Sequence, residues 1–157
     1  MAGTSDPFGL QRFVDAQAGV YDTVVAELRA GRKRSHWMWF VFPQLSGLGA
    51  SAMAQRYGIA SPAEARAYLA HGVLGPRLAE CVGLLTNAVS GRSIEEILGW
   101  PDDIKLRSSM TLFGRACEGG GHTGNCCCSG FRAVLDRFYD GQEDPVTLDR
   151  LAWLARE

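Results

Sequence analysis

Three places in the sequence pair a helix-capping residue with a proline, and they constrain the fold more than any other feature. Asp6-Pro7, Ser61-Pro62 and Asp144-Pro145 each put a side-chain acceptor before a residue whose φ angle suits a first helical turn. Ser61 and Ser93 are each followed by a glutamate three residues later, which is the spacing of a capping box. A chain with this many helix starts is predicted to be all-α.

Apolar residues at the helical period predict where the helices run. The first is expected from Pro7 to a stop at Gly31. The others are expected over roughly 50–57, 62–71, 76–89, 94–99, 102–117, 131–139 and from 145 onward. Because 157 residues fit one domain, we predict a single all-α domain over residues 1–157, a compact bundle of about seven helices.

One irregular aromatic segment, residues 36–47, interrupts this pattern. Its run from Trp37 to Phe42 has strand propensity, whereas Pro43 and two nearby glycines indicate irregular chain. No second strand-like run offers a partner, and an isolated strand is not stable. We therefore expect a buried extended segment.

The Gly/Cys-rich stretch 118–130 is expected to be a loop, and a dispensable insertion is one hypothesis for it. The five cysteines are odd in number and three are adjacent, which is not typical of a disulfide framework. Cys117, His122 and residues 126–128 lack the C-x2-C spacing of a zinc site. We predict neither a metal site nor a cofactor.

Charge and hydropathy limit the classes of partner that the sequence predicts. A net charge of −1 argues against nucleic-acid binding through bulk charge. No apolar run is long enough for a membrane span, and the first residues lack a signal-peptide pattern. The sequence therefore predicts a cytoplasmic protein with no nucleic acid and no membrane as partners, and it leaves a protein partner unknown.

Gln17 lies in the middle of the apolar stripe of the first predicted helix. A buried amide must be hydrogen-bonded, or it costs about 1–3 kcal/mol. One interpretation is that Gln17 fixes a neighbouring loop, for which the 36–47 segment is the candidate. The other is that its amide contacts a ligand.

The segment from Arg34 to Gln44 concentrates groups that suit a flat ligand. Trp37 and Trp39 combine an apolar ring with a polar N–H group, and the imidazole of His36 could act as a general acid or base. The candidate catalytic residue is His36, and the candidate ligand-binding residues here are Lys33, Arg34, Trp37, Trp39 and Gln44. Core packing around a loop is the alternative interpretation.

A second set of candidates lies on one face of the helix that begins near residue 102. Lys105, Ser108 and Ser109 share a face turned away from the apolar stripe. Lys105 lies in the first turn, where the helix dipole favours an anion. A helix packed on both sides, with Lys105 in an ion pair, is the alternative.

Three stretches, 6–17, 29–45 and 102–113, resemble the bacterial domain-of-unknown-function family 1810, whose members are sometimes mislabelled calpastatin-like. They include Asp6-Pro7-Phe8, His36-Trp37-Met38-Trp39-Phe40 and Lys105-Leu106-Arg107-Ser108-Ser109. The resemblance implies a small, mainly α-helical fold. It brings no established activity, so it assigns no catalytic residues, and residues 117–130 depart from its pattern.

Two functions remain open from the sequence. The first is a protein that binds, or an enzyme that acts on, a flat anionic small molecule of the nucleotide or nucleotide-sugar type. It requires the aromatic segment and the Lys105 helix to meet at one cleft. The second is a non-catalytic protein-interaction module, which an exposed apolar patch without a small-molecule site would favour.

Overall fold

A computed structural model describes residues 6–87, 91–119 and 128–156 of the chain. Within these residues the fold is all-α, with one isolated bridge between Leu45 and Ile59 in place of a sheet. The helices are α1 (Gln11–Gln17), α2 (Tyr21–Ala30), α3 (Met38–Val41), α4 (Ala52–Tyr57), α5 (Pro62–Ala70), α6 (Leu74–Thr86), α7 (Ile94–Leu98), α8 (Asp102–Gly119), α9 (Cys128–Tyr139) and α10 (Pro145–Ala155).

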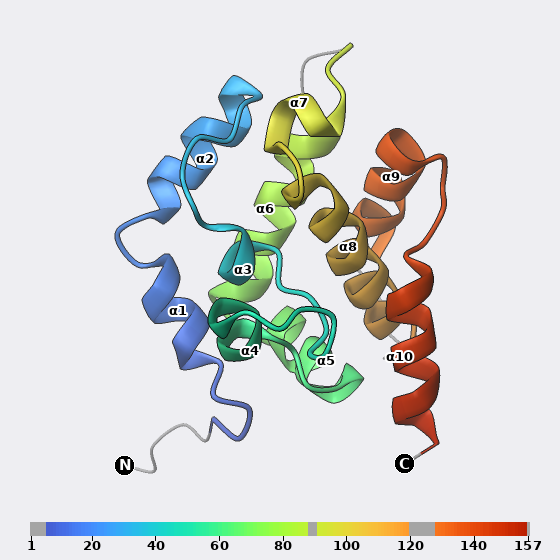
Figure 1. Ribbon diagram of the computed structural model, residues 1–157. Helices are drawn as coiled ribbons and strands as arrows, with labels where there is room; N and C mark the ends of the chain where they lie inside the picture. The colour runs from blue at the N-terminus through green and yellow to red at the C-terminus, as the bar shows by residue number, and fades with distance from the viewer. Residues whose placement is uncertain (1–5, 88–90, 120–127, 157) are drawn as a thin grey trace.

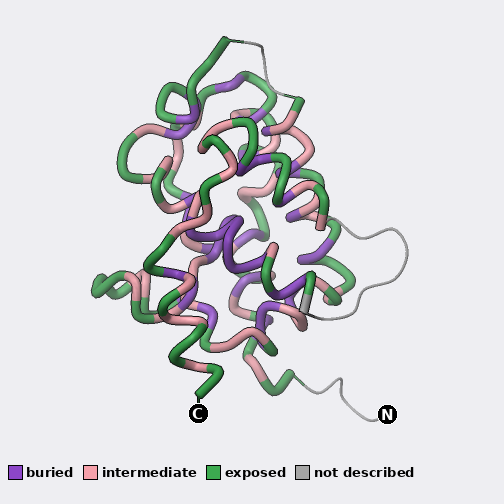
Figure 2. Tube along the Cα trace, turned by 90° about the vertical axis from the view of Figure 1, so that its right-hand side faces the viewer, coloured by how far each residue is buried: buried purple, intermediate pink, exposed green. Residues whose placement is uncertain are grey.

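Helix α8 is the centre of the bundle. It packs against α5, α7, α9 and α10, while α6 packs against α2, α5 and α9. Figure 1 shows α1 and α2 on one side of α8 and α9 and α10 on the other. The buried stretches run through the middle of the molecule in Figure 2, with exposed chain around them.

A chain of aromatic rings connects four of these helices through the core. Phe13 of α1 contacts Tyr68 of α5, and Tyr68 contacts Phe113 of α8, with ring centroids 5.2 Å apart in both pairs. Phe113 stacks on Phe131 of α9 at 5.8 Å. All four side chains are fully buried, so their apolar area contributes strongly to the stability of the bundle.

Most of the predicted helix starts are confirmed. The Ser61 hydroxyl accepts from the amide of Glu64, and the Asp144 carboxylate accepts from the amide of Thr147. Ser93 forms a complete capping box with Glu96 at the start of α7. These caps depend on neighbouring residues only, which is why sequence patterns identify them.

The first predicted helix is wrong in its extent. The chain forms two helices, α1 and α2, separated at Gly19, whose φ of +81° lies in the left-handed region. The N-cap residue of α1 is Leu10 and not Asp6, so the helix begins later than Pro7. The Asp6 carboxylate instead accepts from the amides of Leu10 and Gln11 at the start of this helix. An apolar stripe that continues past a glycine does not show that the backbone bends there.

The extended conformation expected for the aromatic segment is also wrong for its first half. Residues Met38–Val41 form the single helical turn α3. Its amides bond locally, since Val41 N donates to Trp37 O and Phe42 N to Met38 O. The turn buries Trp37 and most of its own side chains while Trp39 stays half-buried.

The connection between α8 and α9 differs from the expected loop at both ends. Helix α8 continues to Gly119 and α9 begins at Cys128, while residues 120–127, including His122 and Cys126–Cys127, lie outside the described residues. Cys117 and Cys128 form a disulfide with their Cα atoms 5.7 Å apart, a pairing that the sequence did not predict. Disulfides are rare in reducing compartments, so the cytoplasmic location stays a prediction.

Candidate functional site

An open groove of about 430 Å³ lies where the aromatic segment meets α8 and the start of α10. We name it the Trp39–Lys105 groove. Its polar wall comes from Gln44, Lys105, Ser108 and Asp144. Its remaining lining is mostly small or apolar and includes Trp39, Leu48, Gly49, Ala50, Ala54, Pro101, Ile104 and Val146. Segments more than 60 residues apart in sequence therefore form one concave surface.

Lys105 and Trp39 form the chemical centre of this groove. The Lys105 Nζ atom lies over the Trp39 ring, 4.8 Å from its centroid, which is a cation–π distance. The same ammonium lies 3.7 Å from Asp102 Oδ1. The other oxygen of that carboxylate forms a shorter ion pair, 2.9 Å, with Lys33.

Two ammonium groups therefore share one carboxylate. The Lys33 side chain is only 7% exposed and forms the closer pair, whereas the Lys105 side chain is 25% exposed and lines the groove. A charge as buried as Lys33 requires its counter-ion. The three groups together carry one positive charge in excess, and Lys105 is the member from which that charge reaches the groove.

The opposite wall is fixed by hydrogen bonds between α8 and α10. Ser108 Oγ donates to Asp144 Oδ2 at 2.8 Å, and the same oxygen accepts from the amide and hydroxyl of Thr147. The Asp144 amide donates to Thr111 Oγ1 at 2.9 Å. The carboxylate that caps α10 thus holds α10 against α8 and also lines the groove.

The structure places Gln17 away from this groove. Its Nε2 atom donates to Phe40 O at 2.7 Å and to the Tyr68 hydroxyl at 3.2 Å, and its Oε1 accepts from Arg77. The side chain is 2% exposed. These contacts are those of an amide that fixes the aromatic segment, the first of the two interpretations drawn from the sequence.

Trp37 is also buried apart from the groove. Its Nε1 atom donates to Glu27 Oε1 at 2.9 Å, beneath the Lys33 ammonium, which lies 5.1 Å from the ring centroid. Glu27 also accepts from the amides of Arg34 and Ser35 and from the Ser35 hydroxyl. Partial burial acts to raise the pKa of Glu27, but these four hydrogen bonds outweigh it and lower the pKa to about 2.

The remaining candidates are not brought together with Lys105 in the groove. His36 and Arg34 are exposed, and neither is among the residues that line it. Ser109 is fully buried, and its hydroxyl has no hydrogen-bond partner among the described residues. Trp39, Gln44, Lys105 and Ser108 are thus the candidates that share one surface, and their role as ligand-binding residues stays a prediction.

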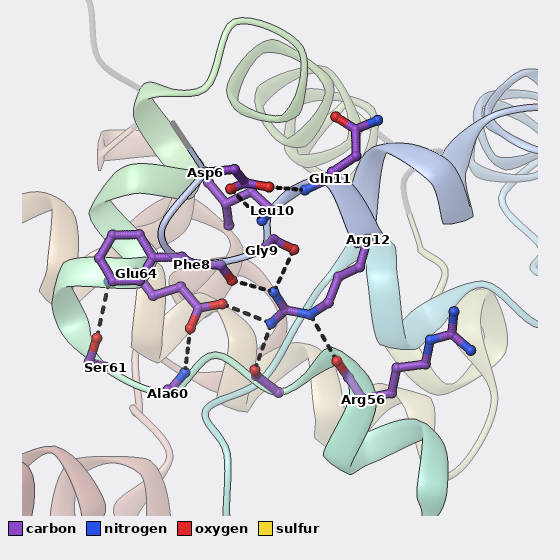
Figure 3. Close-up of polar contacts among 11 residues, drawn as sticks. Asp6, Phe8, Gly9, Leu10, Gln11, Arg12, Arg56, Ala60, Ser61 and Glu64 are labelled. Atoms are coloured by element: carbon purple, nitrogen blue, oxygen red, sulfur yellow. Dashed lines mark hydrogen bonds and ion pairs between the residues drawn. The ribbon is translucent and has the colours of Figure 1, made fainter. Parts of the chain in front are cut away.

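Arg12 is a residue whose role the sequence gave no reason to expect. Its guanidinium donates to the carbonyl oxygens of Arg56, Phe8, Gly9 and Gly58 and to Glu64 Oε2, at 2.7–3.0 Å. Glu64 Oε1 accepts from the Ala60 amide. Figure 3 shows these contacts, which we name the Arg12–Glu64 junction and which join α1, α4 and α5. An arginine in a helix gives no sequence signal of such a role.

The described residues hold no cluster of three or more side chains suited to binding a metal ion. In the same parts of the chain, none of the helices has the length and apolar character needed to cross a membrane.

Comparison with known proteins defines the class of protein. The family model "Protein of unknown function (DUF1810)" matches residues 7–151, and the chain belongs to this family. It is similar to the conserved hypothetical protein Rv1873 from Mycobacterium tuberculosis, whose crystal structure is known. The two are 60% identical with a TM-score of 0.86, over 94% of this chain and 99% of that one. No curated protein matches the chain significantly.

Proposed function

We propose that this protein binds a flat, anionic small molecule of the nucleotide or nucleotide-sugar type in the Trp39–Lys105 groove. The observation that carries the proposal is the position of the Lys105 ammonium over the half-buried Trp39 ring, in a groove of about 430 Å³. An aromatic face beside an incompletely neutralised cation suits a ligand that combines a planar ring with a phosphate.

The other groups in the groove fit such a ligand. The excess positive charge of the Lys33–Asp102–Lys105 cluster is available to an anion at Lys105. Asp144 Oδ2 already accepts three hydrogen bonds from the protein, so Oδ1 is the atom to which a ligand hydroxyl or amino group would donate. The Gln44 amide can both donate and accept.

The proposal is for binding and includes no reaction. His36, the acid or base considered from the sequence, is exposed and does not line the groove. A general acid or base must come within hydrogen-bond reach of the reacting atoms. Gln17 and Trp37 support the groove from the core, because their hydrogen bonds hold the segment that carries Trp39.

The test is calorimetric titration of the full chain with AMP, ADP and UDP-glucose, compared between the wild type and the Trp39→Ala and Lys105→Met variants. At least one ligand should bind with a Kd below about 1 mM, and each substitution should weaken that binding at least about tenfold, the value of one charge-assisted contact. Trp153→Ala is the matched control, because this half-exposed indole does not line the groove.

Two outcomes would overturn the proposal. One is a wild-type protein that binds none of the three compounds. The other is binding that survives both groove substitutions unchanged.

A second candidate function, a protein-interaction surface, is favoured by the rim of the same groove. Ile104 and Val146 line it and are 53% and 57% exposed. Trp100, which directly precedes the lining residue Pro101, is 73% exposed. Exposed apolar residues that gather at one place often mark an interface. Trp100→Ser separates the two candidates. It should leave nucleotide affinity unchanged if the groove serves a small molecule, and it should abolish retention of a specific protein partner if the rim is an interface.

A further inference from the structure

A second and larger groove, of about 780 Å³, lies on the other side of the first turns of α8. Its charged and polar lining comes from residues before and within α7, from α8 and from the end of α9, and includes Arg92, Glu95, Asp103, Arg107, Arg137 and Tyr139. Ile104 lines both grooves and is half-exposed, so it forms the ridge between them. We infer that this second groove is a binding site for a phosphate or diphosphate group, held by Arg92 and Arg107.

Arg107 is fixed in place without being neutralised. Its Nε atom donates to Gln142 O at 3.0 Å and its Nη2 atom to Glu143 O at 2.8 Å. Both acceptors are neutral backbone carbonyls, so the guanidinium keeps its full charge. Its Nη1 atom takes part in neither bond. Two anchored nitrogens leave little side-chain entropy to lose when an anion binds.

Arg92 is held in a similar way from a different element. Its Nη1 atom donates to Gly31 O at 3.4 Å, at the end of α2. A Cβ atom at position 31 would lie 3.4 Å from the Arg92 Cδ atom, which is an ordinary van der Waals distance, so the arginine stem lies against the backbone at this point. Arg92 is exposed and forms no ion pair among the described residues.

The acidic residues of the groove do not cancel this charge. Three arginines and two acids line it, which leaves one net positive charge. Asp103 Oδ1 is completely covered by protein atoms, so that oxygen does not face the opening. Arg115 and Arg132 on the same side of the bundle are different, because both pair with the Glu143 carboxylate.

Guanidinium groups are the usual partners of phosphates because their planar fork matches two phosphate oxygens. Two of them, anchored on carbonyls of separate elements and facing one open groove, form a preorganised anion site. This inference does not rest on the function proposed for the Trp39–Lys105 groove, since it uses neither Trp39 nor Lys105.

The experiment uses the full chain and inorganic pyrophosphate as the probe, titrated by calorimetry at about 50 mM salt, where screening is weak. The wild type should bind one pyrophosphate with saturation. Arg92→Ala should weaken the binding about tenfold. Arg107→Lys, which keeps the charge but loses the fork, should weaken it by a smaller factor. Arg156→Ala, an exposed arginine at the C-terminal end of α10, is the matched control and should bind as the wild type does.

Arg107→Lys is chosen over Arg107→Ala because Arg107 also anchors the chain before α10. The inference is overturned if the wild type shows no saturable binding at millimolar pyrophosphate, or if Arg156→Ala weakens binding as much as Arg92→Ala does. It is also overturned if Lys105→Met abolishes binding while Arg92→Ala keeps it, because the anion then occupies the other groove. Failure of nucleotides to bind at Trp39 would leave these outcomes unchanged.

Discussion

The Arg12–Glu64 junction and the Trp39–Lys105 groove are built from the same kinds of group, a cation, a carboxylate and an aromatic ring. In the junction, the five N–H groups of Arg12 make five hydrogen bonds, and its guanidinium also lies 4.3 Å from the Phe13 ring centroid. Glu64 is 3% exposed and uses both oxygens. No hydrogen-bonding capacity of the cation is left for a ligand.

In the Trp39–Lys105 groove, by contrast, the cation keeps hydrogen-bonding capacity that the protein does not use. Lys105 has three N–H donors, and the carboxylate nearest to it is 3.7 Å away and shared with Lys33. Its aromatic partner Trp39 is half-buried, whereas Phe13 is fully buried. Charge and an aromatic ring therefore do not by themselves distinguish a structural contact from a binding site. The distinguishing property is the hydrogen-bonding capacity that the cation has left for a ligand.

The largest effect should come from breaking the junction. Arg12→Ala leaves the Glu64 carboxylate buried without its counter-ion and should cost about 3–5 kcal/mol in the free energy of unfolding, measured by urea denaturation. Arg56→Ala is the control. Only the carbonyl of that residue contacts Arg12, so the loss should stay below about 1 kcal/mol. Equal losses in the two variants would contradict the role of the junction.

Glu27 should give the next largest effect, and one that depends on pH. Its pKa of about 2 lies below the usual 4.5, so its carboxylate stabilises the folded state fully above about pH 4.5. That contribution is lost as the pH falls from 4.5 towards 2. Glu27→Gln should cost about 1.5–3 kcal/mol at pH 7, the range for a hydrogen bond to a charged group. The stability curves of variant and wild type should converge in acid, and parallel curves down to pH 2 would contradict the assignment.

Gln17→Leu tests the support beneath the groove. It removes the donor to Phe40 O and the acceptor for Arg77, so it should cost about 1–3 kcal/mol by thermal or chemical denaturation. Gln11→Leu is the control. Its side-chain amide donates to the exposed carboxylate of Asp15, so the change in the free energy of unfolding should stay within about 0.5 kcal/mol. A Gln17 variant as stable as wild type would show that the amide does not hold the segment.

Lys105→Met should have the smallest effect on stability. Its ion pair with Asp102 is long and partly exposed, so removing it should cost less than about 1 kcal/mol in a urea titration. A loss similar to that of Arg12→Ala would place Lys105 among the structural contacts and would remove the contrast between the two regions.

How much the sequence could predict depends on how local each feature is. The sequence predicts the starts of α5, α7 and α10 because Ser61, Ser93 and Asp144 each cap through the amide three residues away. The break at Gly19 was missed, because the apolar period continues across it. The helical turn α3 was missed because aromatic residues favour strands in general, whereas here the tertiary packing of Phe40 and Val41 decides.

The candidate site follows the same rule. The ligand-binding hypothesis drawn from the sequence requires the aromatic segment and the start of α8 to meet, and the structure places Trp39 beside Lys105. It could not distinguish Trp39 from Trp37, because which indole faces the core depends on the helical turn between them. Arg12 was not identified as a structural contact, since four of its five acceptors are backbone carbonyls and every residue type offers one.

Because Asp102 lies between two lysines, a ligand in the groove would also affect how α8 is held against the rest of the bundle. An anion that draws the Lys105 ammonium toward itself would release one oxygen of Asp102 and leave that carboxylate to Lys33 alone. Lys33 lies three residues after the end of α2, and its amide donates to Ile97 O in α7. Ligand binding in the groove would therefore strengthen the Lys33–Asp102 ion pair, which connects the chain after α2 to the start of α8. A bound ligand would in this way stabilise the packing of α2, no residue of which lines the groove.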